Sequence, residues 1–230
     1  METELPGALV GAGRNADVYD VGGGRVLRRY RDGRDAAAVD REAQVMAHAR
    51  AHGVPVPEVF EVAGSDIVME RVTGPTMLDV LGRRPWTLRG QARLLARLHE
   101  TVHQAPPLPG MRTAGGGEDP DGEVLLHRDL HPMNVILTSA GPVISDWEGA
   151  ARGPAMYDVA WSWAILASSE VQGAGLALAA VRGLQAQFTR SFVRAAGPID
   201  QASRAQAVRD RLLDHNVLPA ERERRERLPH

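Results

Sequence analysis

Residues 127–134 read His-Arg-Asp-Leu-His-Pro-Met-Asn, and residues 146–148 read Asp-Trp-Glu. Asp129 and Asn134 lie five positions apart, in a segment whose residue types predict a tight loop. A carboxylate in such a loop can orient a hydroxyl group, and an amide with a second carboxylate, Asp146, can hold a magnesium ion. These residue types at this spacing therefore indicate phosphoryl transfer.

Two short apolar runs, at 135–137 and 143–144, lie between the two motifs, with the turn-forming residues 138–142 separating them. This pattern predicts a β-hairpin that would bring Asp146 back beside Asn134. Either motif residue taken alone could simply cap a turn, as Asp and Asn often do. Turn capping does not account for a match at all five fixed positions of His-Arg-Asp-Leu-x-x-x-Asn.

The composition is that of an ordinary globular chain. It has 230 residues, 43% of them hydrophobic, which suffices for one large domain or two small lobes. A net charge of −2 indicates neither a nucleic-acid nor a membrane partner. The chain has no cysteine, no signal-peptide pattern and no apolar run of membrane-spanning length, so we expect a cytoplasmic protein. It also has no lysine, so any side-chain cation at an active site must be arginine or histidine.

The hydrophobic pattern changes character near residue 73. Residues 1–72 read as short strands around one helix at 35–52 and are predicted to form an N-lobe that binds nucleotide. Residues 73–230 read mainly as helices and are predicted to form a C-lobe with the catalytic loop and the acceptor site. Strands followed by helices favour an α+β fold with two lobes.

Four segments together resemble the aminoglycoside phosphotransferase and choline kinase-like family, distant relatives of the protein kinases. They are the loop at 127–134, the Ile-Ser-Asp-Trp run at 144–147, the segment from Gly153 to Ala160, and Leu-Ala-Arg-Leu-His at 95–99. The resemblance implies a two-lobed protein kinase-like fold and an ATP- and Mg²⁺-dependent phosphotransferase.

The resemblance also implies roles for residues in and around the loop. Asp129 would be the catalytic base, and Asn134 and Asp146 would hold Mg²⁺ against the ATP phosphates. His127 would brace the loop. Asp158 is similar to the buried aspartate that binds the backbone of the catalytic loop, although its position near a helix start also suits a simple N-cap.

The same resemblance places a nucleotide site in the N-lobe. Gly11 and Gly13 follow the glycine-rich pattern that lets backbone N–H groups approach phosphates, with Ala16 replacing the third glycine. Arg28 occupies the place of the phosphate-binding lysine, and arginine can grip a phosphate through two parallel N–H bonds. Glu42 would be the acidic partner of this cation, unless it is a surface carboxylate of an amphipathic helix.

Two further positions complete that site. Glu70 and Val72 lie in the segment that resembles the hinge strand, whose backbone would bind adenine. Arg29 neighbours Arg28 and should point to the opposite face of its strand, so only one of them can serve the nucleotide.

The motifs leave the acceptor open. It could be a hydroxyl of an aminoglycoside, of another antibiotic or of a metabolite, and the oligomeric state is equally undetermined. A cationic aminoglycoside would require an acidic pocket, but the acidic residues of the C-terminal part are scattered; they include Glu170, Asp200, Asp210 and Asp214. Two alternatives stand beside a small-molecule kinase. One is a nucleotide-binding pseudokinase that acts as a regulator or scaffold, and the other, which ranks lower, is a protein kinase.

Overall fold

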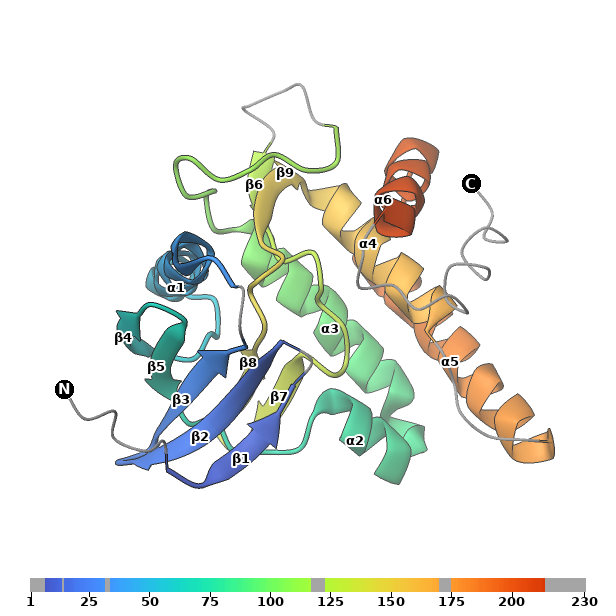
Figure 1. Ribbon diagram of the computed structural model, residues 1–230. Helices are drawn as coiled ribbons and strands as arrows, with labels where there is room; N and C mark the ends of the chain where they lie inside the picture. Colours follow the sequence, from blue (N-terminus) through green and yellow to red (C-terminus); the bar gives the residue numbers. More distant parts are fainter. Residues whose placement is uncertain (1–6, 14, 32–33, 117–122, 170–174, 214–230) are drawn as a thin grey trace. The chain divides into compact units, whose positions relative to one another are not determined.

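The computed structural model describes residues 7–13, 15–31, 34–116, 123–169 and 175–213. The chain forms two compact units, residues 1–74 with 136–148 and residues 75–135 with 149–230. Most strands lie in the first unit and all helices but one in the second, so the predicted α+β class is confirmed (Figure 1). The division into units differs from the expected lobes, residues 1–72 and 73–230, mainly in one segment. The segment Ile136–Glu148 was assigned to the C-lobe, but it groups with the first unit.

The first unit is built on an antiparallel sheet of five strands in the order β1-β2-β3-β5-β4 (Figure 1). The strands are β1 (Leu9–Ala12), β2 (Ala16–Gly22), β3 (Arg25–Tyr30), β4 (Val59–Ala63) and β5 (Asp66–Glu70). Gly22, Gly23 and Gly24 connect β2 to β3 with positive φ angles, which glycine adopts without a steric cost. Strand β4 pairs with β5 around Gly64.

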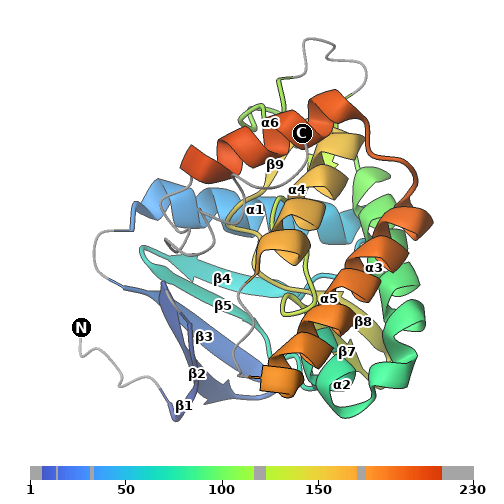
Figure 2. The ribbon, with the colours of Figure 1, turned by 90° about the vertical axis from the view of Figure 1, so that its right-hand side faces the viewer.

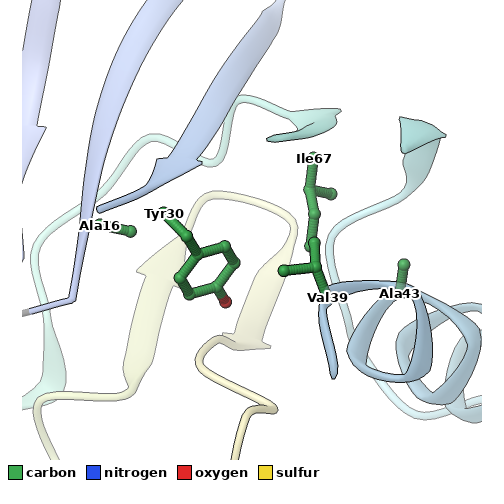
Figure 3. Close-up of a cluster of buried hydrophobic side chains, with 5 residues drawn as sticks. All are labelled: Ala16, Tyr30, Val39, Ala43 and Ile67. Atoms are coloured by element: carbon green, nitrogen blue, oxygen red, sulfur yellow. The ribbon is translucent and has the colours of Figure 1, made fainter. Parts of the chain in front are cut away.

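Helix α1 (Ala36–Ala51) packs against the sheet and closes the core of this unit. Asp35 is its N-cap and accepts a hydrogen bond from the backbone of Ala37 at 3.1 Å. Figure 3 shows the buried cluster between helix and sheet, which consists of Ala16, Tyr30, Val39, Ala43 and Ile67.

The predicted hairpin after residue 134 is present as β7 (Val135–Thr138) and β8 (Gly141–Ile144). The backbone N–H of Ile144 donates to the carbonyl of Pro55 at 2.7 Å, which ties the hairpin to the segment after α1. A side chain on Gly74 would come within 2.4 Å of the Leu137 carbonyl, so the chain passes closely over the hairpin there.

The described residues of the second unit are helical apart from one pair of strands (Figure 2). Helix α5 packs against α3 and α4, and α6 packs against α4. The helices are α2 (Met77–Arg83), a 3₁₀ turn (Pro85–Thr87), α3 (Leu88–His103), α4 (Ala155–Ser168), α5 (Gly175–Ala196) and α6 (Gln201–Leu213). None of the helices in the described part of the chain is long and apolar enough to span a membrane.

Strands β6 (Glu123–Leu126) and β9 (Ala151–Pro154) form an antiparallel pair just before and after the two motifs. The sequence analysis predicts no strand at the position of β9. The sequence Ala-Arg-Gly-Pro of β9 has low strand propensity, so its conformation depends on pairing with β6. Gly153 allows a close approach, because a side chain there would lie 2.3 Å from the Ala114 carbonyl oxygen.

Candidate active site

The loop at 127–134 is anchored by a buried carboxylate from the first turn of α4. Asp158 is fully buried, and its oxygens accept hydrogen bonds from the backbone N–H groups of His127 at 3.2 Å and Arg128 at 2.7 Å. The third partner is the ring of His103, 3.0 Å away. The alternative that Asp158 caps its helix is wrong, because Pro154 occupies the N-cap position.

Burial alone would disfavour the charge on Asp158. The hydrogen bond and charge of His103, with smaller contributions from His99 and His127, outweigh the burial, so the pKa of Asp158 lies well below its usual range. A buried carboxylate that stays ionised can hold two backbone N–H groups strongly. His127 also braces the loop, since its Nδ1 accepts a hydrogen bond from the Asp129 backbone at 3.2 Å.

The side chain of Asp129 is held among polar groups yet remains 36% exposed. Asn134 Nδ2 donates to its Oδ2 at 3.0 Å and to its backbone carbonyl at 2.9 Å. His131 Nε2 lies 3.4 Å from Oδ2, and Arg211 Nη1 lies 3.9 Å from Oδ1. Burial opposes ionisation of Asp129, but His131, His127 and Arg211 outweigh it, so the pKa lies below its usual value. Asp129 is therefore an accessible, ionised carboxylate at neutral pH.

Arg128 adopts a backbone conformation that residues other than glycine rarely take. Its φ is +63°, in the left-handed region that strains any residue with a Cβ. The Asp158 hydrogen bond to its backbone holds this conformation. Its guanidinium carbon lies 4.4 Å from the ring centre of Trp161 on α4, within the range of a cation–π contact.

Arg211 is a site residue that the sequence did not reveal. It lies on α6, it is 8% exposed, and its guanidinium contacts both Asp129 and the ring of Trp161. The sequence predicts mainly helices in this part of the chain, but no motif links Arg211 to the loop. Of the acidic candidates for an acceptor pocket, Asp200 binds Ser203 at the start of α6, whereas Glu170 and Asp214 lie outside the described residues.

In the first unit, Arg28 and Glu42 form the expected ion pair. Arg28 Nη1 donates to Glu42 Oε1 at 2.9 Å, and Glu42 is only 3% exposed, so its alternative as a surface carboxylate is wrong. Burial raises the pKa of Glu42, partly offset by Arg28 and by the hydrogen bond from the Tyr30 hydroxyl. Arg29 instead pairs with Asp66 at 2.6 Å, in agreement with the expected opposite direction of the two arginines.

Arg28 also reaches the second motif. Its Nη2 donates to Asp146 Oδ1 at 3.2 Å, and Asp146 has a φ of +66°. Glu148, which the sequence did not single out, accepts hydrogen bonds from Asn15 at 3.3 Å and from Arg34. Asp146 and Glu148 thus each contact an arginine of the first unit.

The remaining nucleotide-site predictions fall on the sheet. Gly11 lies in β1, and Gly13 closes the turn before β2 by donating to the Ala16 carbonyl at 2.8 Å. Glu70 ends β5, and Val72 follows it. The roles of all four residues toward a nucleotide stay predictions.

Asn134 and Asp146 each carry the kind of side-chain group that a magnesium ion binds. Both carry oxygen donors, and the Asp146 side chain is 41% exposed. The Asn134 amide nitrogen is directed to Asp129, and the amide oxygen is the atom of this side chain with the chemistry of a magnesium ligand. Among the described residues no three His, Asp or Glu side chains cluster as a closed metal cage. Mg²⁺ does not require one, since it usually takes one or two protein groups and keeps several waters.

Comparison with known proteins decides the family. The model of the phosphotransferase enzyme family matches residues 7–122 and 118–197. The chain belongs to this family. The family resemblance expected from the four motif segments is confirmed, and so is the assignment to the phosphotransferases at the level of the family.

Two curated proteins are similar over part of the chain. A probable serine/threonine-protein kinase BUD32 homolog of Archaeoglobus fulgidus is 32% identical over 99 residues, which are 43% of this chain and 38% of that protein. A probable bifunctional tRNA threonylcarbamoyladenosine biosynthesis protein of Methanoculleus marisnigri is 35% identical over 148 residues, 60% of this chain and 24% of that protein. The aligned regions therefore span well under half of either relative.

Solved structures of phosphotransferases share the fold. A thermostable mutant of aminoglycoside phosphotransferase APH(4)-Ia has a TM-score of 0.59 and 17% identity, with 89% of this chain and 85% of that chain covered. A choline/ethanolamine kinase family protein from Mesorhizobium loti has a TM-score of 0.60 and 17% identity, with 90% and 75% covered. The predicted two-lobed protein kinase-like fold is thereby confirmed.

Proposed function

We propose that this phosphotransferase moves the γ-phosphoryl group of ATP to a hydroxyl of a small molecule. Structures of related fold include complexes with AMP-PNP, an ATP analogue, which supports ATP as the donor. The observation that carries the proposal is the state of Asp129, a partly exposed carboxylate held ionised by its neighbours. A group of this kind is suited to receive the hydroxyl of an acceptor.

Asp129 would accept a hydrogen bond from the acceptor hydroxyl and point its oxygen at the phosphorus. As the new O–P bond forms, the bond to the bridging oxygen breaks and ADP leaves. The hydroxyl proton passes to the Asp129 carboxylate and from there to water. A carboxylate with a lowered pKa is a weak base, so orientation of the hydroxyl is its larger contribution. Asn134 would keep Asp129 in place through its amide N–H.

Arg28, Glu42 and Asp146 would serve the nucleotide. Arg28 would bind phosphate oxygens, and Glu42 would hold its guanidinium in position, as in the ion pair at 2.9 Å. Asp146 and Asn134 would hold Mg²⁺, which when bound would neutralise phosphate charge. Gly11 and Gly13 would bring backbone N–H groups to the phosphates, and the backbone near Glu70 and Val72 would bind adenine.

The test is ADP formation by the full chain with ATP, Mg²⁺ and a panel of hydroxylated compounds that includes aminoglycosides, amino alcohols, sugars and hydroxy acids. At least one compound should stimulate ADP release. The variant Asp129→Asn should lose about 10²-fold or more of that rate. The matched control Glu100→Gln, on the exposed face of α3, should keep it. ATP binding, measured separately by calorimetry, should be the same in all three proteins.

A protein acceptor is the second candidate, because one similar protein is named a probable serine/threonine-protein kinase. The same assay therefore includes a protein substrate rich in serine and threonine. Phosphorylation of that substrate alone would replace the small-molecule acceptor with a protein. ATP binding without any acceptor-stimulated ADP release would favour the regulator or scaffold.

A further inference from the structure

A cavity of about 240 Å³ lies in the second unit where helices α3 and α5 pack side by side (Figure 2). One of its lining residues comes from α3 and four come from α5, at the spacing i, i+3, i+4 and i+7 that places them on one face of the helix. The lining residues are Arg89, Gln187, Arg190, Ser191 and Arg194, and we call this cavity the arginine groove.

Every side chain that lines the arginine groove carries a hydrogen-bond donor, and none of them is a carboxylate. Arg89, Arg190 and Arg194 are exposed and form no ion pair within 4.0 Å with any carboxylate of the described residues. Gln187 and Ser191 are half-buried, and their side chains make no hydrogen bond within the described part of the chain. Three positive charges and two neutral donors therefore meet at one cavity.

The stability of the two helices does not account for these arginines. Arg190 and Arg194 are four positions apart, where like charges on a helix repel each other. Arg89 lies in the first turn of α3, where the helix dipole disfavours a cation and no acidic residue offsets it. Helix α5 contains no acidic residue, although the whole chain has a net charge of −2. A bound anion would relieve this local excess of positive charge.

The size and the donors of the arginine groove favour a phosphate group. Pockets that hold drug-sized ligands have volumes of about 300–1,000 Å³, so a cavity of about 240 Å³ suits a smaller ligand. A phosphate group carries a charge of about −1.5 to −2 at pH 7 and presents at least three acceptor oxygens. Arginine can bind two of these oxygens through parallel N–H bonds, and a carboxylate has too few oxygens for the five side chains.

We propose that the arginine groove binds a phosphate group, either as inorganic phosphate or as part of a small phosphorylated molecule. Arg89, Arg190 and Arg194 supply charge-assisted hydrogen bonds, and Gln187 and Ser191 supply neutral ones. The proposal does not rest on the proposed kinase function, because it concerns binding alone and the groove shares no residue with the candidate active site.

Calorimetric titrations of the unmodified full chain test the proposal. The ligands are inorganic phosphate, pyrophosphate, glycerol 3-phosphate and, as a carboxylate of small size, acetate. The titrations are done at low ionic strength, without ATP or Mg²⁺. We expect at least one phosphate compound to bind about 10- to 100-fold more tightly than acetate, the range of a charge-assisted contact. The preferred compound distinguishes the free ion from a phosphorylated molecule.

Variants locate the bound phosphate. Arg190→Gln and Arg194→Gln should each weaken phosphate binding by about tenfold, and Arg190→Lys should restore part of the loss because the charge returns. The matched control is Arg182→Gln, an exposed arginine on the same helix and about two turns before the groove, which should bind as the unmodified chain does. Arg28→Gln, in the first unit, should also keep the affinity for phosphate. Circular dichroism shows whether each variant folds.

Several results would overturn the proposal. Acetate binding as tight as that of every phosphate compound, or no measurable binding of any of them, removes the phosphate site. Equal phosphate affinity in folded Arg190→Gln, Arg194→Gln and Arg182→Gln removes the assigned residues, and a loss in Arg28→Gln alone moves the ion to the nucleotide site. A labelled single-stranded RNA that binds through Arg190 while no small phosphate compound binds would replace the small ligand with a nucleic acid.

Discussion

Removing the charge of Asp158 should release the loop that carries Asp129. We consider the variant Asp158→Asn, which keeps the shape of the side chain. The carboxylate accepts hydrogen bonds from the backbone of His127 and Arg128 and from the ring of His103. The amide of asparagine has one oxygen, which accepts, and one NH₂ group, which donates. At least one of the groups that now donate to Asp158 would therefore face the NH₂ group, which cannot accept its hydrogen bond.

The expected loss of stability follows from these contacts. A hydrogen bond to a charged group contributes about 1.5–3 kcal/mol, and a buried donor left without a partner costs about 1–3 kcal/mol more. Asp158 is fully buried, so water cannot replace the lost acceptor. We expect Asp158→Asn to lower the free energy of unfolding by about 3–5 kcal/mol. His103→Gln removes one partner and leaves both backbone contacts, so it should cost about 1–2 kcal/mol.

Urea unfolding monitored by circular dichroism measures both variants, with Glu100→Gln as the exposed control. The pH dependence provides a second check. Because the pKa of Asp158 is lowered by folding, its contribution is complete above the unfolded value of about 4 and is lost as the pH falls through the folded value. The difference between the unmodified chain and Asp158→Asn should therefore be constant from about pH 5 to 8 and shrink below about pH 4. A loss under about 1 kcal/mol at pH 7 would refute the anchoring role.

Three further predictions concern the nucleotide cation, a buried histidine and two glycines. Arg28→Ala should lower the rate of ADP formation by about 10²–10³-fold, whereas Arg29→Ala should change it little, because only Arg28 contacts Glu42 and Asp146. Burial lowers the pKa of His99 to about 4, so this ring binds a proton more readily in the unfolded chain than in the folded one. As the pH falls from 6.5 to 4, protonation of His99 should therefore lower the free energy of unfolding by about 3 kcal/mol. In urea unfolding, Gly183→Ala on the open face of α5 should stabilise by about 0.5–1 kcal/mol, whereas Gly153→Ala should destabilise by about 1–3 kcal/mol because its Cβ would meet a carbonyl oxygen at 2.3 Å.

Each of these predictions has a contrary result. Loss of activity in Arg29→Ala with none in Arg28→Ala would mean that the other arginine serves the nucleotide. An unchanged slope of stability against pH in His99→Gln would show that this ring does not titrate as inferred. A stable Gly153→Ala would mean that the strand pair can shift to admit a methyl group.

The local parts of the site were predictable because their residues are neighbours in sequence. The loop at 127–134 and the hairpin after it follow from turn-forming residues and short apolar runs. The alternation of side chains along a strand predicts that only one of Arg28 and Arg29 can serve the nucleotide, and the motif spacing favours Arg28. The burial of Glu42 did not follow, since a helix with few large apolar residues gives a weak signal for its inner face.

Contacts between distant segments could not be read from periodicity. The strand β9 is stabilised by β6, and its own residues indicate no strand. The segment Ile136–Glu148 follows the loop at 127–134 in sequence but groups with the N-terminal sheet. Arg211 lies far from Asp129 along the chain, and only the packing of α6 on α4 brings the two together.

The sequence by itself determined the family and its reaction class, because the motif residues between 127 and 148 lie close together in the chain and their spacing is set by local backbone geometry. The tertiary structure decided the electrostatic surroundings of Asp129. Charge interactions depend on distance in space, and Arg211, whose Nη1 lies 3.9 Å from Asp129 Oδ1, comes from a segment that no local pattern connects to the loop at 127–134.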